Sequence, residues 1–92
     1  MATYLMLGKY TVEALKGASA DRTKKALDVI AKAGGKVRSM FALLGPYDLA
    51  LIVDMPDNGA AIRVSADLAK MTGVGFTTSP TLSVEEFDKV IA

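Results

Sequence analysis

The sequence predicts an α+β fold in which a four-stranded antiparallel sheet carries two helices on one face. Three observations support this prediction. Segments rich in strand-forming residues alternate with two stretches of helical periodicity. A four-residue turn joins the second and third of these strand segments, and capping residues stand at the helix boundaries. The chain has 92 residues, so we expect a single domain over residues 1–92.

The first half of the chain predicts a strand followed by a helix. Residues 3–10 (TYLMLGKY) are rich in strand formers, and residues 11–16 can make one helical turn. The longer helix follows, with Ser19 or Asp21 accepting hydrogen bonds from its first amides. Gly34-Gly35 ends it, because glycine tolerates the left-handed conformation that closes a helix. Its apolar stripe consists of Thr23, Ala26, Leu27, Ile30, Ala31 and Ala33.

Two further strands are predicted in the middle of the chain, at residues 36–44 (KVRSMFALL) and 49–54 (LALIVD). The residues between them, Gly45–Asp48, predict a tight connection, because proline at the second position of a turn fixes its own φ at about −65°. The two strands are therefore expected to pair as a hairpin.

The second long helix is predicted over residues 58–72. Asp57 or Asn58 can cap its start, and Gly73 stops it. Its apolar stripe consists of Ala61, Val64, Ser65, Leu68 and Met71.

The chain ends with a strand and a short helix. Residues 74–82 predict the fourth strand, with Pro80 marking an edge or an irregular end. Ser83–Glu86 is a capping-box pattern, and the helix after it carries Phe87, Val90 and Ile91. The order βαββαβ with a terminal helix is that of the ferredoxin-like fold. Right-handed crossovers place both long helices on one face of the sheet.

Both faces of the predicted sheet are apolar, although two helices can cover only one. The other face would expose several hundred Å² of apolar surface, more than soluble monomers usually show. We expect a second copy to pack there sheet to sheet, which gives a homodimer or a higher homo-oligomer. The alternative is that the C-terminal segment folds across this face. The residues expected in the interface are Tyr4, Met6, Met40, Ala42 and Leu44.

Composition excludes several classes of function. The net charge of +1 argues against nucleic acid as a partner. The absence of histidine and cysteine removes the commonest general base, thiolate nucleophiles and the usual zinc, copper and haem ligands, so we expect no metal and no cofactor. The N-terminus does not have the pattern of a signal peptide, and no apolar run is long enough to span a membrane. We therefore expect a cytoplasmic location.

The turn and its surroundings resemble the GYD-domain family of small bacterial and archaeal proteins. The residues that carry the resemblance are YLMLGKYT near the start, Asp21-Arg22, Gly34-Gly35, GPYDLALIVDMPDN, Gly73 and SVEEF near the end. The resemblance implies the dimeric α/β-barrel superfamily and its assembly, in a family of largely uncharacterised role. A weaker similarity runs to the regulatory domain of the leucine-responsive (Lrp/AsnC) regulators, which implies an amino-acid effector site between dimers beside the turn.

Four residues are candidates for a ligand site: Gly45, Tyr47, Asp48 and Thr78. Tyr47 and Asp48 could orient a small polar metabolite at a subunit boundary, and Thr78 could bind its carboxylate. The structural alternative is that Asp48 accepts hydrogen bonds from turn amides, that Tyr47 packs its ring, and that Thr78 pairs with hydroxyl groups across strands.

The sequence thus predicts a homo-oligomeric protein that binds a small ligand or serves as an accessory or regulatory module. The alternative, implied by the superfamily, is a small cofactor-independent enzyme similar to a monooxygenase or an isomerase. Its possible bases would be Asp48, Asp54 and the tyrosines. No nucleophile pair or oxyanion signature accompanies them, so we lean against catalysis and assign no catalytic residue.

Overall fold

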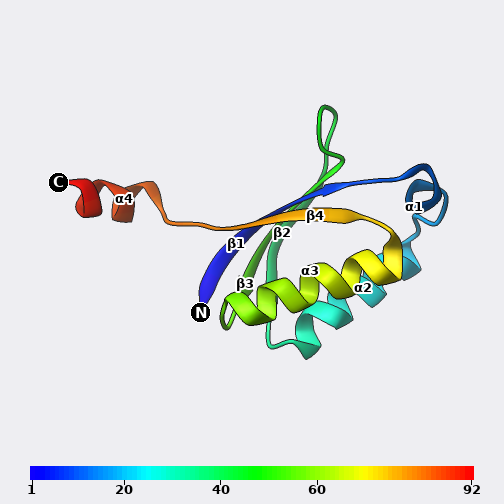
Figure 1. Ribbon diagram of the computed structural model, residues 1–92, viewed down its shortest axis with the longest axis horizontal. Helices are drawn as coiled ribbons and strands as arrows, with labels where there is room; N and C mark the ends of the chain where they lie inside the picture. The colour runs from blue at the N-terminus through cyan, green and yellow to red at the C-terminus, as the bar shows by residue number, and fades with distance from the viewer.

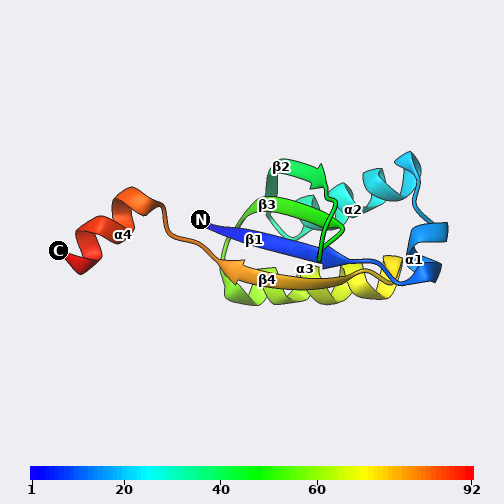
Figure 2. The same cartoon turned by 90° about the horizontal axis from the view of Figure 1, so that it is seen from above.

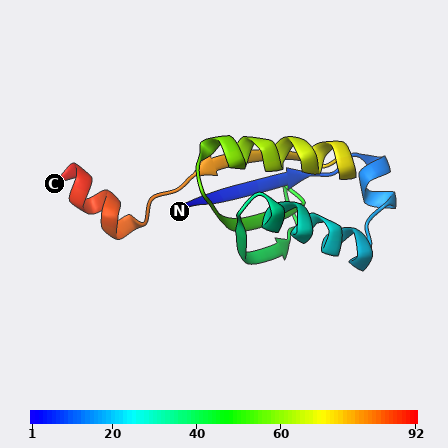
Figure 3. The ribbon, with the colours of Figure 1, turned by 90° about the horizontal axis from the view of Figure 1, so that it is seen from below.

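The four strands form one antiparallel sheet in the computed structural model, which describes residues 1–92. In chain order the elements are β1 (Ala2–Lys9), α1 (Val12–Lys16), α2 (Ala20–Lys32), β2 (Lys36–Ala42), β3 (Leu49–Met55), α3 (Asn58–Thr72), β4 (Gly75–Pro80) and α4 (Val84–Ile91). The strand order is β2-β3-β1-β4. Helices α2 and α3 lie side by side under one face of this sheet (Figures 1 and 3). The prediction of a ferredoxin-like α+β fold is confirmed.

The helices begin where their capping residues predict. Ser19, Asp57 and Ser83 each accept a hydrogen bond from the backbone N–H three residues further on, at 2.8 to 3.1 Å. Of the alternatives that the sequence leaves open, Ser19 therefore caps α2 and Asp57 caps α3. Gly73, with φ +77°, ends α3 in the left-handed conformation.

The hydrophobic core lies between the sheet and the two long helices. Its members are almost fully buried: Tyr4, Met6, Ile30, Leu51, Val53, Met55, Ala61, Val64 and Leu68. Tyr4 keeps its one polar atom satisfied, because its hydroxyl donates to Asn58 Oδ1 of α3 at 2.5 Å.

The face of β1 that the helices cover is the opposite of the predicted one. Tyr4 and Met6 were expected in the interface between subunits, but they are 2% and 1% exposed under α2 and α3. Leu5 and Leu7 point to the open face instead, opposite Ile52 and Ala50 of β3. The assignment of Tyr4 and Met6 to an interface is therefore wrong, because burial inside one chain already uses their surface.

A β-bulge changes the direction of the second half of β2. Val37 pairs with Val53, whereas Ser39 pairs with Ile52, so Arg38 is the extra residue. The bulge turns Met40 and Ala42 to the helix side, where Met40 pairs with the buried Leu51, and it turns Phe41 to the open face. Met40 and Ala42 therefore do not lie on the open face, although both side chains are exposed at the edge of the sheet. Leu44 stays available for a partner, because it is fully exposed in the loop before β3.

The open face of the sheet is apolar at its centre and charged at one corner. Leu5, Leu7, Ala50 and Ile52 are only partly covered there, and Phe41 is 57% exposed beside them. Arg38 and Asp54 form an ion pair at the corner, with 3.0 Å between Nε and Oδ2. No helix of the chain is long and apolar enough to cross a membrane.

Helix α4 does not cover the open face. It stands apart from the body at the far end of β4 (Figures 1 and 2), and every one of its residues is exposed. The segment before it is tied to β1, since Thr81 donates to Thr3 O through both its backbone N–H and its hydroxyl. The apolar residues of α4 are left without a partner in the chain: Val84, Phe87, Val90 and Ile91.

Candidate functional site

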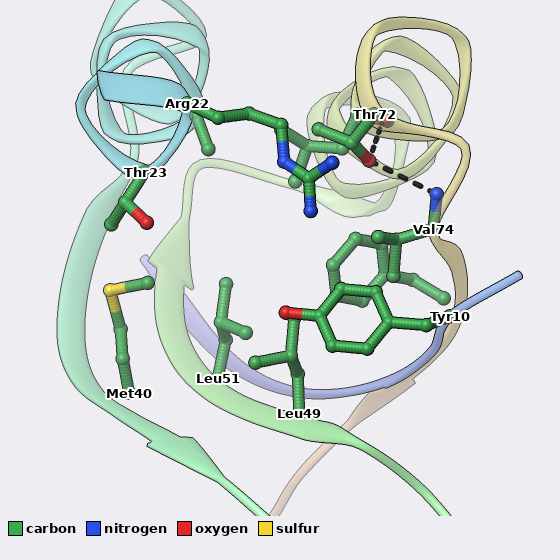
Figure 4. Close-up of a pocket in the computed structure, with 11 residues that line it drawn as sticks. Tyr10, Arg22, Thr23, Met40, Leu49, Leu51, Thr72 and Val74 are labelled. Atoms are coloured by element: carbon green, nitrogen blue, oxygen red, sulfur yellow. Dashed lines mark hydrogen bonds between the residues drawn. The ribbon is translucent and has the colours of Figure 1, made fainter. Parts of the chain in front are cut away.

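A small cavity lies between the sheet and the N-terminal turns of α2, close to the end of β1 (Figure 4). Its volume is about 80 Å³. The walls come from α2, β2, β3, α3, β4 and the connection that follows β1, and most of them are apolar: Tyr10, Arg22, Thr23, Ala26, Met40, Leu49, Leu51, Leu68, Thr72, Val74 and Phe76. Three of the four strands and both long helices thus contribute to the cavity.

Arg22 is the only charged residue in the cavity wall. It belongs to the first turn of α2, and its guanidinium group extends toward Tyr10 (Figure 4) with its centre 5.9 Å from the centroid of the ring. One nitrogen, Nη1, donates to the carbonyl oxygen of the buried Ala14 at 2.5 Å. The guanidinium group is therefore held in place from one side, and its other N–H groups remain available.

The phenol of Tyr10 supplies the second polar group. Its hydroxyl points into the cavity between Leu49 and Leu51 (Figure 4), and it makes no hydrogen bond within the chain. The backbone of Tyr10 is fixed by Asp48, whose Oδ2 accepts from the Tyr10 N–H at 2.8 Å. The Asp48 N–H in turn donates to Gly8 O at 2.8 Å. Asp48 consequently sets where Tyr10 enters the cavity wall, two residues before α1 begins.

Asp48→Ala should lower the free energy of unfolding by about 1.5 kcal/mol, because the substitution removes a carboxylate acceptor from a partly buried amide. Urea denaturation with an unchanged m-value checks this. The control is Asp28→Ala on the exposed side of α2, which should change stability by less than about 0.5 kcal/mol. Equal effects from the two substitutions would show that the contact with Tyr10 contributes nothing.

The four predicted ligand residues do not form one site. Asp48 has the structural role that the sequence left as the alternative, although its partner is Tyr10 rather than an amide of the turn. Gly45 is exposed with φ +139°, and nothing lies within 4 Å of a Cβ built there. Glycine is needed at this position for its backbone conformation and not for a close approach. Tyr47 is half-buried beside these residues, and none of the three lines the cavity.

Thr78 lies on the helix side of β4, away from the turn. Its hydroxyl is 2.6 Å from that of Ser65 in α3, so it pairs with a helix rather than with a neighbouring strand. Both residues line an open groove between α3 and the edge strand β4, of about 600 Å³. Its other walls are mostly small or apolar, including Ala61, Ile62 and Ala69.

The polar groups of the cavity wall are a cation and hydroxyl groups, a combination that suits an anion better than a cation. No aspartate, glutamate, histidine or cysteine lines it, and no cluster of three or more such residues exists anywhere in the chain to hold a metal ion. One guanidinium, one phenol hydroxyl and the two threonines Thr23 and Thr72 face a mainly apolar space. Sequence reasoning considered Tyr10 only among the tyrosines as possible bases and did not name Arg22 as a site residue, although Arg22 offered one signal. A cation in the first turn of a helix opposes the positive end of the helix dipole, so it calls for another explanation.

Comparisons with known proteins agree with this fold. The family model described as GYD domain matches residues 4–91. The crystal structure of the Mycobacterium tuberculosis leucine response regulatory protein (LrpA) is similar to the chain, with a TM-score of 0.62 and 13% sequence identity. The match covers 89% of this chain and 51% of that one, so the chain spans about half the length of the regulator. Among curated proteins no sequence matches.

Proposed function

The chain belongs to the GYD domain family, and we propose that it is a homo-oligomeric accessory or regulatory module that binds a small ligand in the cavity beside Tyr10 and Arg22. The observation that carries the proposal is this cavity, in which two available polar groups converge on an apolar space within one chain. Cavities of this kind, apolar with a few placed polar groups, are typical ligand sites. The similarity in fold to a leucine response regulatory protein supports a regulatory role.

The uncovered sheet face supports the oligomer. Two leucines of β1 and Ala50 and Ile52 of β3 form its apolar centre, and α4 turns away from it. A second copy packed on this face would bury that centre, at a gain of about 25 cal/mol per Å² of apolar area before ordering costs. The exposed apolar stripe of α4 offers a further contact for the same partner.

Ala26→Leu tests the ligand site, because Ala26 lines the cavity and a leucine side chain would fill much of its volume. In a thermal-shift screen of polar metabolites, wild type should gain stability from at least one compound. The filled variant should lose that gain while it keeps its fold, since the new side chain packs against apolar walls.

The matched control is Ala31→Leu, which adds the same side chain on the exposed side of α2. It should respond to the compound as wild type does. A screen in which no compound stabilises wild type, or in which Ala26→Leu responds fully, would contradict the proposal.

The position of the cavity also favours a second candidate, a small cofactor-independent enzyme. A sensor of the Lrp/AsnC kind would share its site between subunits, whereas residues of a single chain line this cavity. Tyr10 would be the residue able to exchange a proton with a bound substrate, since no other titratable acid or base except Arg22 lines the cavity. If wild type converts a bound compound chemically, and Tyr10→Phe still binds the compound but no longer converts it, the protein is an enzyme rather than a binding module.

We propose no nucleic-acid or membrane partner, and the cytoplasm stays the predicted location.

A further inference from the structure

The arginines of this chain differ in their partners. Arg38 and Arg63 each pair with a carboxylate, Asp54 and Asp67, with the guanidinium nitrogen and carboxylate oxygen 3.0 Å apart. Arg22 makes no ion pair, although it is less exposed than these two residues. A partly buried cation beside apolar walls loses hydration that a carboxylate would normally replace.

The position of Arg22 in its helix adds to this cost. It stands in the first turn of α2, where the helix dipole is positive and favours anions rather than cations. The backbone N–H of Arg22 is taken by the cap Ser19, and Nη1 is taken by Ala14 O. What remains is a fixed guanidinium face, with no carboxylate of the chain in front of it. Asp21 in the same turn offsets this charge at the helix end, but it makes no ion pair with the guanidinium group, whose remaining N–H groups are free to bind an anion.

From these contacts we infer that the cavity binds a short-chain monocarboxylate. Arg22 receives the carboxylate as a charge-assisted pair, and the Tyr10 hydroxyl donates to one of its oxygens. The apolar tail lies against Leu49, Leu51 and Phe76. This inference rests on the proposed function and names the class of ligand for the same site.

The size of the cavity limits the tail. A volume of about 80 Å³ equals somewhat less than three water molecules at their share of the liquid, which suits a tail of about three carbons. Butyrate is therefore the probe of choice.

The absence of acids from the wall disfavours α-amino acids at this site. An α-ammonium group needs a carboxylate or several free acceptors, and none of the lining residues is acidic. The Thr72 hydroxyl already accepts from the Val74 N–H, so only the Thr23 and Tyr10 hydroxyl oxygens remain as side-chain acceptors in the wall. The chain should therefore differ from an amino-acid sensor in its choice of ligand, even though it is similar in fold to a leucine response regulatory protein.

Three compounds with the same carbon chain test the inference: butyrate, the neutral butyramide, and 2-aminobutyrate. Binding is measured by isothermal titration and by amide chemical shifts of the cavity residues. Butyrate should bind wild type at least about tenfold more tightly than either of the other two, because only it offers an anion without a buried ammonium. Equal binding of butyrate and butyramide would overturn the inference, and so would tighter binding of 2-aminobutyrate.

Arg22→Gln should weaken butyrate binding at least about tenfold, and Tyr10→Phe about fivefold. Arg63→Gln is the matched control, since it removes a helix arginine that lies outside the cavity, and it should leave butyrate binding unchanged. Unchanged binding in a folded Arg22→Gln would overturn the inference. Should this variant unfold, the comparison of butyrate with butyramide on wild type decides alone.

The outcome separates the ligand class from the function. Suppose that butyrate does not bind, but that another metabolite stabilises wild type and Ala26→Leu abolishes its effect. This result would overturn the inference of a monocarboxylate ligand and leave the proposed function standing. No binding of any compound would overturn both.

Discussion

Ile52→Glu should convert the assembled protein into monomers. Ile52 lies at the centre of the open face, opposite Leu5 of β1 and Ser39 of β2. In one chain the new carboxylate would stay hydrated, because this face is open. Between two packed sheets it would be buried without a partner, which costs about 3–5 kcal/mol and raises the dissociation constant of a dimer roughly 150- to 5,000-fold.

Light scattering at micromolar concentration measures the result. Wild type should run at twice 9.7 kDa or a multiple of it, and Ile52→Glu at 9.7 kDa. Ala31→Glu adds the same charge on the exposed side of α2 and should keep the wild-type mass. A monomeric wild type would contradict the oligomer, and an unchanged mass for Ile52→Glu would show that the open face is not the interface.

Gly35→Val should lower the free energy of unfolding by about 3 kcal/mol, because Gly35 lies where the end of α2 touches β3. A Cβ built at this position would overlap Met55 Sδ and would lie 2.9 Å from Ile30 Cγ2 and 3.1 Å from Asp54 O. Both side chains belong to the buried core, and the third atom is backbone, so none of them can move away cheaply.

A fall in Tm of roughly 15 °C is expected for Gly35→Val in a domain of this size. Gly75→Val is the matched control, because nothing lies within 4 Å of a Cβ there and β4 is extended. It should be close to neutral. A stable Gly35→Val would mean that α2 shifts away from β3 without loss of packing.

The sequence was sufficient to predict the helices and strands, but it was not sufficient to predict which face of the sheet the helices cover. Helix starts followed from capping side chains such as Ser19 and Asp57, which act locally on the amides next to them. The buried face of β1 could not be predicted in this way, because Tyr4 and Met6 on one face are as apolar as Leu5 and Leu7 on the other. With both alternations apolar, only packing against α2 and α3 decides which set is buried.

The bulge at Arg38 is a second feature hidden from the sequence. If the side chains of β2 alternated strictly, Met40 and Val37 would lie on opposite faces of the sheet. Because Arg38 is one extra residue in the strand, both lie on the same face.

The cavity was missed for a different reason. Tyr10 follows β1 and Arg22 belongs to α2, and in the sequence neither stands near the GPYD turn that drew the functional interpretation. Only the fold brings Asp48 to the backbone of Tyr10, across 38 positions of sequence. The functional meaning of the turn therefore lies in how it supports Tyr10, and a reading of the turn by itself could not show that.

The central place of β1 has a consequence for the synthesis of the protein. This strand is made first, but its two neighbours end at Met55 and Pro80, which are 25 residues apart. At about 5–20 residues per second, a ribosome needs roughly 1–5 s to add the second neighbour after the first is complete. During that interval the backbone edge of an apolar strand stays unpaired, in a form that can recruit other nascent chains. The quick arrival of β4 therefore protects the growing chain from aggregation.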